Sequence, residues 1–408
     1  MTTNNSEAKF NLTHNQQHKR SGMIAKSIIG KTPSEIQKAL EECISDGSLP
    51  DGQDFKPTLA IIMISNMDDS EQLRTIFGNR DIAIFGITSP QKFSEDGITE
   101  DDILVMLLDM KPDNFKIELN DYEGSSVYEA GYNAGMSGKT AFSNPGFIIA
   151  PVNFVFSHDD LIRGLTDAAG RDIMIAGGGC GDPTDFSGVV FTNDTSSKGG
   201  LLALILDQDK VSISGLAVSG WKPVGTSKKI TKCEGAWALT IDNEPAMHVI
   251  QRFLGNDIAR DNSEGSEFIP TDMGYPLQFE RASGNPIMKP ALFFNPADQS
   301  VMIAGGVKEG DNFRFSLPPD FDVIDKVVET TRISKEKEMP DADALMVFSC
   351  IGRLGTFGPL ISTEIEGLAS TWGKPMIGYF SLGEFGKLDE GRCEFQGTTV
   401  SWVALKEK

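Results

Sequence analysis

The chain has 408 residues, a length that favours two or three domains rather than one. Hydrophobic residues make up 39% of it, as in ordinary globular proteins, and the formal net charge is -21 at pH 7. Because so acidic a chain repels phosphate backbones and anionic lipid surfaces, we expect no nucleic acid partner. No run approaches the roughly 18 consecutive apolar residues of a spanning helix, so we also expect no membrane insertion.

The N-terminal segment and the cysteines indicate where the protein works. Residues 1–20 are polar, and we predict a disordered tail that lacks the apolar core of a signal peptide. The five cysteines lie far apart and form no Cys-x-x-Cys pair, so neither a disulfide framework nor a metal site is expected. These features predict a reducing, cytoplasmic location.

The first clear element is a helix that begins at Pro33. Thr32 is placed to cap this helix, and Glu35 is placed to complete a capping box. Ile36 and Leu40 then supply the four-residue apolar spacing of a helix with one buried face.

A longer pattern follows, in which strand, helix, strand, glycine-rich loop and strand occur in the same order three times. Apolar runs rich in Ile, Val and Phe favour strands that are buried on both faces. The first two strands of each copy are expected to be parallel and joined by a right-handed crossover. The last two strands are candidates for a long hairpin. The strands are predicted at residues 58–65, 81–87 and 102–109, at 145–157, 171–182 and 200–207, and at 343–349, 374–386 and 398–405.

Between the second and third copies, residues 211–317 hold short strand-like runs and a helix with Pro245 in its first turn. Within this bridge, residues 257–272 are polar and rich in Gly, Ser and Pro, which is typical of a linker. The predicted fold class is therefore α/β, with two domains of mixed β-sheets flanked by helices and built from the repeated unit. We place these domains at residues 21–264 and 265–408.

Three motifs occur in a familiar order. The first is a Gly-Trp-x-Pro-x-Gly turn with an acid-glycine pair and a Pro-Ala helix start, here Gly220, Trp221, Pro223, Gly225, Glu234, Gly235, Pro245 and Ala246. The second is a Cys-x-x-Arg segment at Cys350 and Arg353, and the third is a glycine-rich segment ending in Gly-Glu, with Gly378, Gly383 and Glu384. In these motifs the chain resembles the FIST family, the F-box and intracellular signal transduction proteins.

This resemblance implies a FIST N-terminal domain over residues 21–264 and a FIST C-terminal domain over residues 265–408. It implies a sensory protein of intracellular signal transduction that binds a small molecule and is not an enzyme. Such a stand-alone sensor would act through a signalling partner, such as a histidine kinase or a chemotaxis component. Some bacterial members are linked to haem and nitric oxide sensing, so a haem-binding nitric oxide sensor is the alternative; otherwise no cofactor is expected.

The first candidate binding residues follow a strand of the third copy. Open α/β sheets bind ligands at the carboxyl ends of their strands, where Ser349 and Cys350 lie. Arg353 adds a planar set of donors suited to a carboxylate or phosphate. Two plainer interpretations stay open, in which Cys350 packs as a small hydrophobic residue and Arg353 pairs with a structural carboxylate.

The neighbouring strand of the third copy ends in a second group of candidates. Glu384 follows Gly383, and either Tyr379 or Ser381 points inward because side chains alternate along a strand. Glu384 and Arg353 would then face one cleft and form a dipolar clamp suited to an amino acid or another small carboxylate. The alternative is that Glu384 caps a turn or pairs with Arg353 itself.

Further candidates come from the second copy and the bridge. Gly178 and Gly179 allow close backbone approach, and Cys180 and Asp182 follow them at the equivalent strand end. No helix follows these glycines, which argues against a dinucleotide site. Trp221 either packs a turn or forms a wall of the pocket.

Two histidines outside the polar tail are candidates for haem ligation, His158 and His248. A lone histidine is more often a surface or packing residue. Two further hypotheses from other classes are an enzyme with Cys350 as its nucleophile and a scaffold that acts only through protein contacts.

Overall fold

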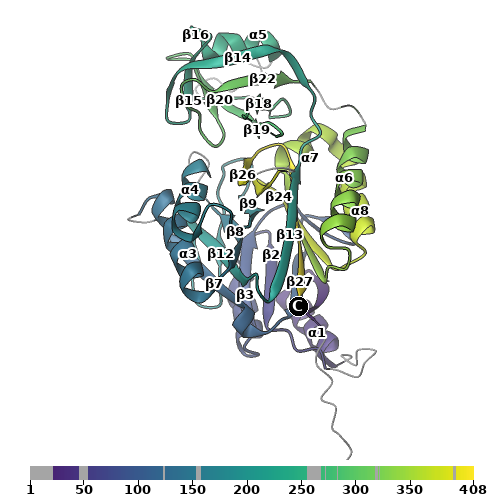
Figure 1. Cartoon of the computed structure of the whole chain (residues 1–408). Helices are drawn as coiled ribbons and strands as arrows, with labels where there is room; N and C mark the ends of the chain where they lie inside the picture. The colour runs from purple at the N-terminus through teal and green to yellow at the C-terminus, as the bar shows by residue number, and fades with distance from the viewer. Residues whose placement is uncertain are drawn as a thin grey trace, which may run out of the picture.

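The structure is a computed structural model, and Figure 1 shows the whole chain. It describes residues 22–45, 54–122, 125–152, 158–254, 268–271, 273–282, 284–317, 320, 322–388 and 392–408. The predicted disordered tail and the predicted boundary between residues 264 and 265 both lie outside the described residues.

The main body is α/β and consists of three copies of one unit, as the repeat predicted, although each copy also contains a preceding strand and helix. The first copy is β1 (Ile24–Gly30), α1 (Pro33–Ser45), β2 (Leu59–Ile64), α2 (Ser70–Gly78), β3 (Ala83–Thr88), β4 (Lys92–Ser94), β5 (Gly97–Thr99) and β6 (Ile103–Asp109). The second is β7 (Phe115–Asp121), α3 (Val127–Ala141), β8 (Pro145–Pro151), α4 (His158–Ala169), β9 (Ile175–Gly178), β10 (Val190–Phe191), β11 (Ser196–Ser197) and β12 (Gly200–Asp207). The third is β13 (Val211–Val218), α6 (Asp322–Glu338), β23 (Ala344–Cys350), α7 (Ile351–Phe357), α8 (Ile361–Trp372), β24 (Met376–Ser381), β25 (Glu384–Lys387), β26 (Cys393–Gln396) and β27 (Val400–Glu407).

The strand pairing is the same in all three copies. The two strands that flank the crossover helix are parallel, as predicted, in the pairs β2–β3, β8–β9 and β23–β24. The predicted long hairpin is wrong, because the last strand of each copy pairs antiparallel with the far side of the first strand of that crossover. The other edge of that first strand is already occupied by its parallel partner.

The glycine-rich loop of each copy forms a short hairpin that joins the sheet of another copy. The hairpin β4–β5 pairs with β24 of the third copy, β10–β11 pairs with β3 of the first, and β25–β26 pairs with β9 of the second. This cyclic exchange links the three sheets, so none of the copies is complete without the others.

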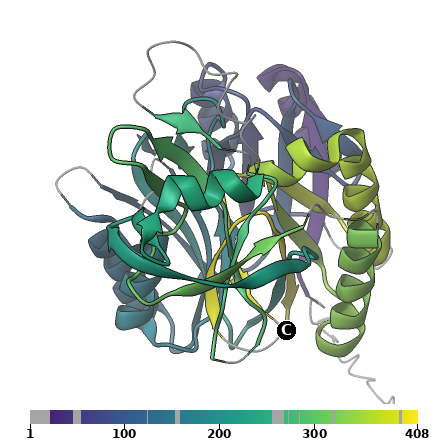
Figure 2. The same ribbon diagram turned by 90° about the horizontal axis from the view of Figure 1, so that it is seen from above.

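Each sheet has a helical layer on its outer face and a shared core on its inner face. Figure 2 shows the helix groups on three sides of the molecule. Along β2, Ala60 and Ile62 pack toward α1 and α2, whereas Ile61 and Met63 face the central core. This core also takes residues from the sheets of the other two copies. Burial on both faces explains why these strands are almost continuously apolar.

The beginning of α1 follows the predicted cap at Thr32, but the Glu35 carboxylate bonds the residue before the cap instead of completing the capping box. The helix starts at Pro33, and the backbone N–H of Glu35 donates to the Thr32 hydroxyl at 3.3 Å. The Glu35 carboxylate accepts from the backbone N–H of Lys31 at 2.7 Å, which satisfies a donor at the helix start.

A separate β-rich unit is inserted into the third copy, between β13 and α6, and lies at the top of Figure 1. It contains α5 (Ala246–Leu254) and the strands β14 (Pro223–Glu234), β15 (Trp237–Ile241), β16 (Glu244–Pro245), β17 (Ile269–Pro270), β18 (Leu277–Phe279), β19 (Ile287–Lys289), β20 (Ala291–Asn295), β21 (Ser300–Ile303) and β22 (Asn312–Ser316). The chain before and after residue 264 shares the sheet of this unit, and it also shares two sheets of the main body.

Candidate functional site

The hairpin exchange brings the glycine-rich loops of the second and third copies together. Glu384 is the register partner of Gly178 in the antiparallel pairing of β25 with β9. The backbone N–H of Gly179 donates to the Gly383 carbonyl at 2.9 Å, and the Tyr379 hydroxyl donates to the Gly178 carbonyl. The predicted binding residues of these two copies are therefore neighbours, although some 200 residues separate them in the chain.

Two of these glycines leave no space for a side chain. A Cβ atom on Gly178 would lie 2.7 Å from Cβ of Ser381. Gly383 has a φ of +102°, and a Cβ atom there would lie 2.4 Å from the Phe395 ring. These positions require glycine because neighbouring side chains fill the space of a Cβ atom and, at Gly383, because the backbone has a positive φ.

Glu384 is a fully buried carboxylate with satisfied oxygens. It accepts hydrogen bonds from the Ser381 hydroxyl at 2.6 Å and from the Thr399 hydroxyl and backbone N–H at 2.8 and 3.2 Å. Burial raises the pKa of Glu384 to about 8, and the hydrogen bonds offset only part of that cost. The Cys350 thiol also lies beside it.

Arg353 is fully buried as well, but its carboxylate partner is Glu364 of α8. Arg353 Nε donates to Glu364 Oε1 at 3.0 Å, and Nη2 donates to Oε2. Nη1 donates to the carbonyls of Ser219 and Thr398 at 2.9 and 3.4 Å. The predicted clamp between Arg353 and Glu384 is not formed, because α8 presents a carboxylate directly to the guanidinium fork.

A strained turn lies between the two buried side chains of Arg353 and Glu384. Thr398, whose carbonyl accepts from Arg353, has a φ of +56°, an unfavourable value for a β-branched residue. Thr399, the next residue, donates to Glu384. Arg353 and Glu384 thus hold opposite sides of one turn rather than one ligand.

The guanidinium of Arg353 also supports Trp221. Its central carbon lies 5.0 Å from the ring centroids of both Trp221 and Phe357, which is a favourable cation–π distance. Trp221 Nε1 donates to the Gly274 carbonyl at 3.0 Å. The indole is therefore fixed on one side by Arg353 and at its polar edge by the inserted unit.

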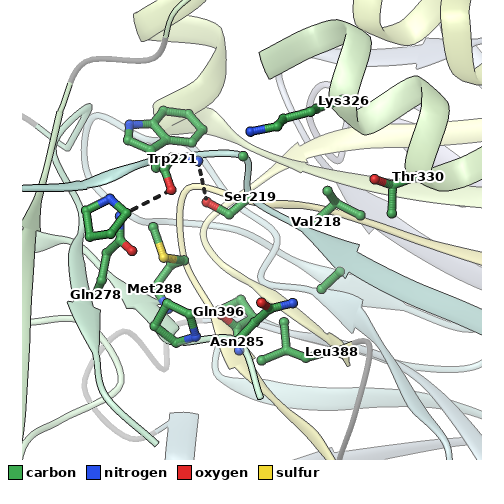
Figure 3. A pocket seen from close by; sticks show the side chains of 14 residues that line it. Val218, Ser219, Trp221, Gln278, Asn285, Met288, Lys326, Thr330, Leu388 and Gln396 are labelled. Carbon is green, nitrogen blue, oxygen red and sulfur yellow. Dashed lines mark hydrogen bonds between the residues drawn. The ribbon is translucent and has the colours of Figure 1, made fainter. Parts of the chain in front are cut away.

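Trp221 also forms part of one wall of a pocket of ≈ 380 Å³, whose lining side chains Figure 3 shows. This volume falls within the range of about 300–1,000 Å³ that is usual for small-ligand sites. The wall segment 217–223, the β18–β19 hairpin, α6 and the β25–β26 hairpin all contribute to the lining. The lining residues are Ala217, Val218, Ser219, Gly220, Trp221, Pro223, Gln278, Asn285, Pro286, Met288, Lys326, Thr330, Leu388 and Gln396.

Of the residues proposed from the sequence, Trp221 lines this pocket. Lys326 is the one charged side chain among the described lining residues, and Figure 3 shows its amine directed toward Trp221. Sequence reasoning missed both Lys326 and Gln396. Lys326 lies on the exposed side of an amphipathic helix, and a glutamine before a glycine is an ordinary strand end, so neither carries a distinctive spacing.

The remaining proposed residues do not line this pocket. Ser349 is 0% exposed, and Cys180 is fully buried with a pKa raised to about 12 by desolvation. Cys350 and Gly383 line a second, mostly apolar cavity of only ≈ 30 Å³. Asp182 belongs to a turn in which its carboxylate accepts from Thr184.

The two candidate haem ligands do not fit a haem. His158 is 1% exposed, and its ring lies 3.7 Å from that of Phe395, so the histidine is packed on an aromatic side chain. The cavity beside it is the one of ≈ 30 Å³, far below the size of a cofactor site. His248 lies exposed on α5.

Two features of the described residues concern membrane and metal partners. No helix there is both long and apolar enough to traverse a bilayer. No group of three or more His, Cys, Asp or Glu side chains in the described segments has an arrangement that could hold a metal ion.

The fold and the site define a protein of three interlocked α/β units with a ligand-sized pocket beside an inserted β-rich unit. Residues 58–244 match the family model of the FIST N domain, and residues 246–387 match that of the FIST C domain. The chain belongs to the FIST family, whose domains are associated with sensory signal transduction and small-ligand binding. No curated protein matches the chain in a sequence search.

Proposed function

We propose that this protein is a sensor that binds an amino acid or another small carboxylate in the pocket of ≈ 380 Å³ and has no catalytic activity. The observation that carries the proposal is the pocket itself, because its walls come from both the FIST N and the FIST C segments. A ligand held between segments from both halves can favour one relative placement of them over another.

The chemistry of the lining supports an anionic ligand. Lys326 supplies a positive charge, and no ion pair of Lys326 is found among the described residues. Trp221 and Met288 provide apolar contact area, and the hydroxyls of Ser219 and Thr330 provide polar contacts. Such a mixture of apolar walls with a few polar groups is typical of sites for small organic ligands.

The signal would pass from the pocket to a separate protein, such as a histidine kinase or a chemotaxis component. Trp221 and Ser219 line the pocket and contact Arg353, which binds Glu364 of α8. A ligand that moves this wall therefore acts on α8 through direct contacts. The surface of α8 would present the change to the partner.

A survey of the standard amino acids and small carboxylates by thermal shift and calorimetry tests the proposal. We expect at least one of them to stabilise the protein and to bind with measurable heat. The Lys326→Ala variant is expected to bind this compound roughly 10-fold more weakly, because it loses a charge that faces the ligand.

The control for that experiment is Lys38→Ala, which removes another exposed lysine, on α1 and outside the pocket lining. Its binding should equal that of the wild type. Equal affinities of the Lys326 variant and the wild type would rule out this pocket as the carboxylate site.

The burial and the raised pKa of the Cys350 thiol support the proposal that the protein is not an enzyme. This thiol is buried, and desolvation and the neighbouring Glu384 carboxylate raise its pKa, so little reactive thiolate is available. With iodoacetamide at neutral pH, we expect Cys350 to be alkylated at least about 100-fold more slowly in the folded than in the unfolded protein. Peptide mass spectrometry measures the rate, with half-buried Cys43 as the internal reference. Labelling of Cys350 faster than Cys43 would instead favour a nucleophile.

A further inference from the structure

We infer that Gln396 is a specificity-determining residue that donates a hydrogen bond to an oxygen atom of the bound molecule. This inference rests on the proposed function, since it concerns the same pocket. It states more closely which ligands the pocket accepts: those with a carboxylate or carbonyl oxygen, rather than those that carry only donor groups.

The orientation of the Gln396 amide follows from its one hydrogen bond. Gln396 Oε1 accepts from the backbone N–H of Met288 at 3.0 Å. A backbone N–H requires an acceptor, so the oxygen of the amide must lie on that side and Nε2 on the other. The Nε2 group therefore presents donors only.

Nothing in the described part of the chain accepts a hydrogen bond from Gln396 Nε2. The side chain is 0% exposed, so bulk water does not replace the missing partner. A buried donor without an acceptor destabilises the folded state, because it has lost its hydrogen bonds to water and gained none in return. Such a group is unusual in a native interior and requires an explanation.

The second glutamine of the same pocket, Gln278, has acceptors for its buried amide nitrogen. Gln278 Nε2 donates to the Trp221 carbonyl at 3.3 Å and to the Ser316 hydroxyl at 2.9 Å. The contrast singles out Gln396, which belongs to the lining of the pocket and whose amide nitrogen has no acceptor among the described residues. A ligand oxygen at this place would supply the missing acceptor.

Figure 3 shows Gln396 beside Met288 and Asn285, on the side of the pocket away from Lys326 and Trp221. Two donor groups, an ammonium and an amide N–H, thus belong to different walls. A ligand with only donors finds no acceptor at Gln396 and meets the positive charge of Lys326. A site that leaves a polar group unpaired with the wrong ligand discriminates strongly against it.

The test uses the full chain labelled with 5-fluorotryptophan, which has four tryptophans and hence four fluorine resonances. The Trp221 resonance is assigned by its absence in Trp221→Phe. We expect acetate and acetamide at millimolar concentrations to shift the Trp221 resonance, because both offer an acceptor oxygen. Methylammonium, which offers only donors, should leave it unchanged.

Gln396→Glu is the decisive variant. Its carboxylate keeps the acceptor for the Met288 N–H but replaces the donor by a second acceptor. At about pH 8 we expect acetate and acetamide to bind at least about 10-fold more weakly than to the wild type. As the pH is lowered and the new carboxyl is protonated, it regains a donor, so acetamide binding should recover. A purely structural role of Gln396 would not produce this pH profile.

Gln208→Glu serves as the matched control, because this glutamine bonds with Asn144 and Pro145 and is not part of the pocket. Equal binding of acetate and acetamide by the wild type and by Gln396→Glu at about pH 8 would overturn the inference and leave the proposed pocket intact. The inference would also fail if methylammonium bound as well as acetate, or if none of the three probes moved the Trp221 resonance. Acetamide binding that depends on Gln396, without binding of any carboxylate, would support the inference and refute the proposed ligand class.

Discussion

Replacing Arg353 by alanine is expected to lower the free energy of unfolding by about 3–5 kcal/mol. The substitution leaves Glu364 as a fully buried carboxylate that has lost both donors of its bidentate partner. It also removes the donor to the Ser219 carbonyl and the cation that lies against both Trp221 and Phe357. An uncompensated buried charge is among the most destabilising changes that a single substitution makes.

Equilibrium urea unfolding of the wild type and of Arg353→Ala measures this effect. The double variant Arg353→Met with Glu364→Met should regain much of the stability, because it removes both charges and keeps the volume of the side chains. Arg332→Ala is the control, since Arg332 forms exposed ion pairs with Glu329 and Glu336 that contribute at most about 1 kcal/mol. A loss for Arg353→Ala no greater than that for Arg332→Ala would contradict the prediction.

The second large effect is a loss of stability as the pH rises, caused by Glu384. The pKa of this carboxyl is about 8 in the folded protein against an ordinary value of 4.5, chiefly because of burial. The unfolded state therefore releases this proton at a lower pH than the folded state. The contribution of Glu384 to stability is complete below about pH 4.5 and is lost progressively up to about pH 8. At about 1.4 kcal/mol for each pKa unit, the change amounts to as much as about 5 kcal/mol.

Comparison of the wild type with Glu384→Gln isolates this contribution, because the variant cannot titrate at this position. We expect the unfolding free energy of the wild type, relative to the variant, to fall between about pH 5 and pH 8.5. Other groups, including His158 with its lowered pKa, titrate in both proteins and cancel in the difference. A difference that stays constant over this range would show that the pKa of Glu384 is not raised.

Local patterns in the sequence predicted much of the secondary structure and part of the topology. The apolar runs identified the buried strands, and the capping residues Thr32 and Glu35 identified the start of α1. The repeated order of elements correctly predicted the parallel pairs across each crossover. These features depend on neighbouring residues and on the handedness of short connections, which one stretch of chain contains in full.

Local sequence patterns could not predict the partners of the charged residues. Arg353 and Glu384 follow adjacent strands, which suggested one shared site, but Arg353 binds Glu364 and Glu384 binds Ser381 and Thr399. Which carboxylate meets a guanidinium depends on how α8 docks on its sheet. That docking is decided by the packing of many apolar side chains together.

By itself, then, the amino-acid sequence determined that this is an α/β protein of repeated units with the motifs of the FIST family, and the matches over residues 58–244 and 246–387 confirm the family. The tertiary structure alone decided that the three hairpins exchange between sheets and that the pocket is lined by Trp221, Lys326 and Gln396. The reason is physical. Strand periodicity and capping act over a few residues, whereas the pocket is formed by segments more than 170 residues apart, from Ala217 to Gln396, whose meeting depends on the whole core.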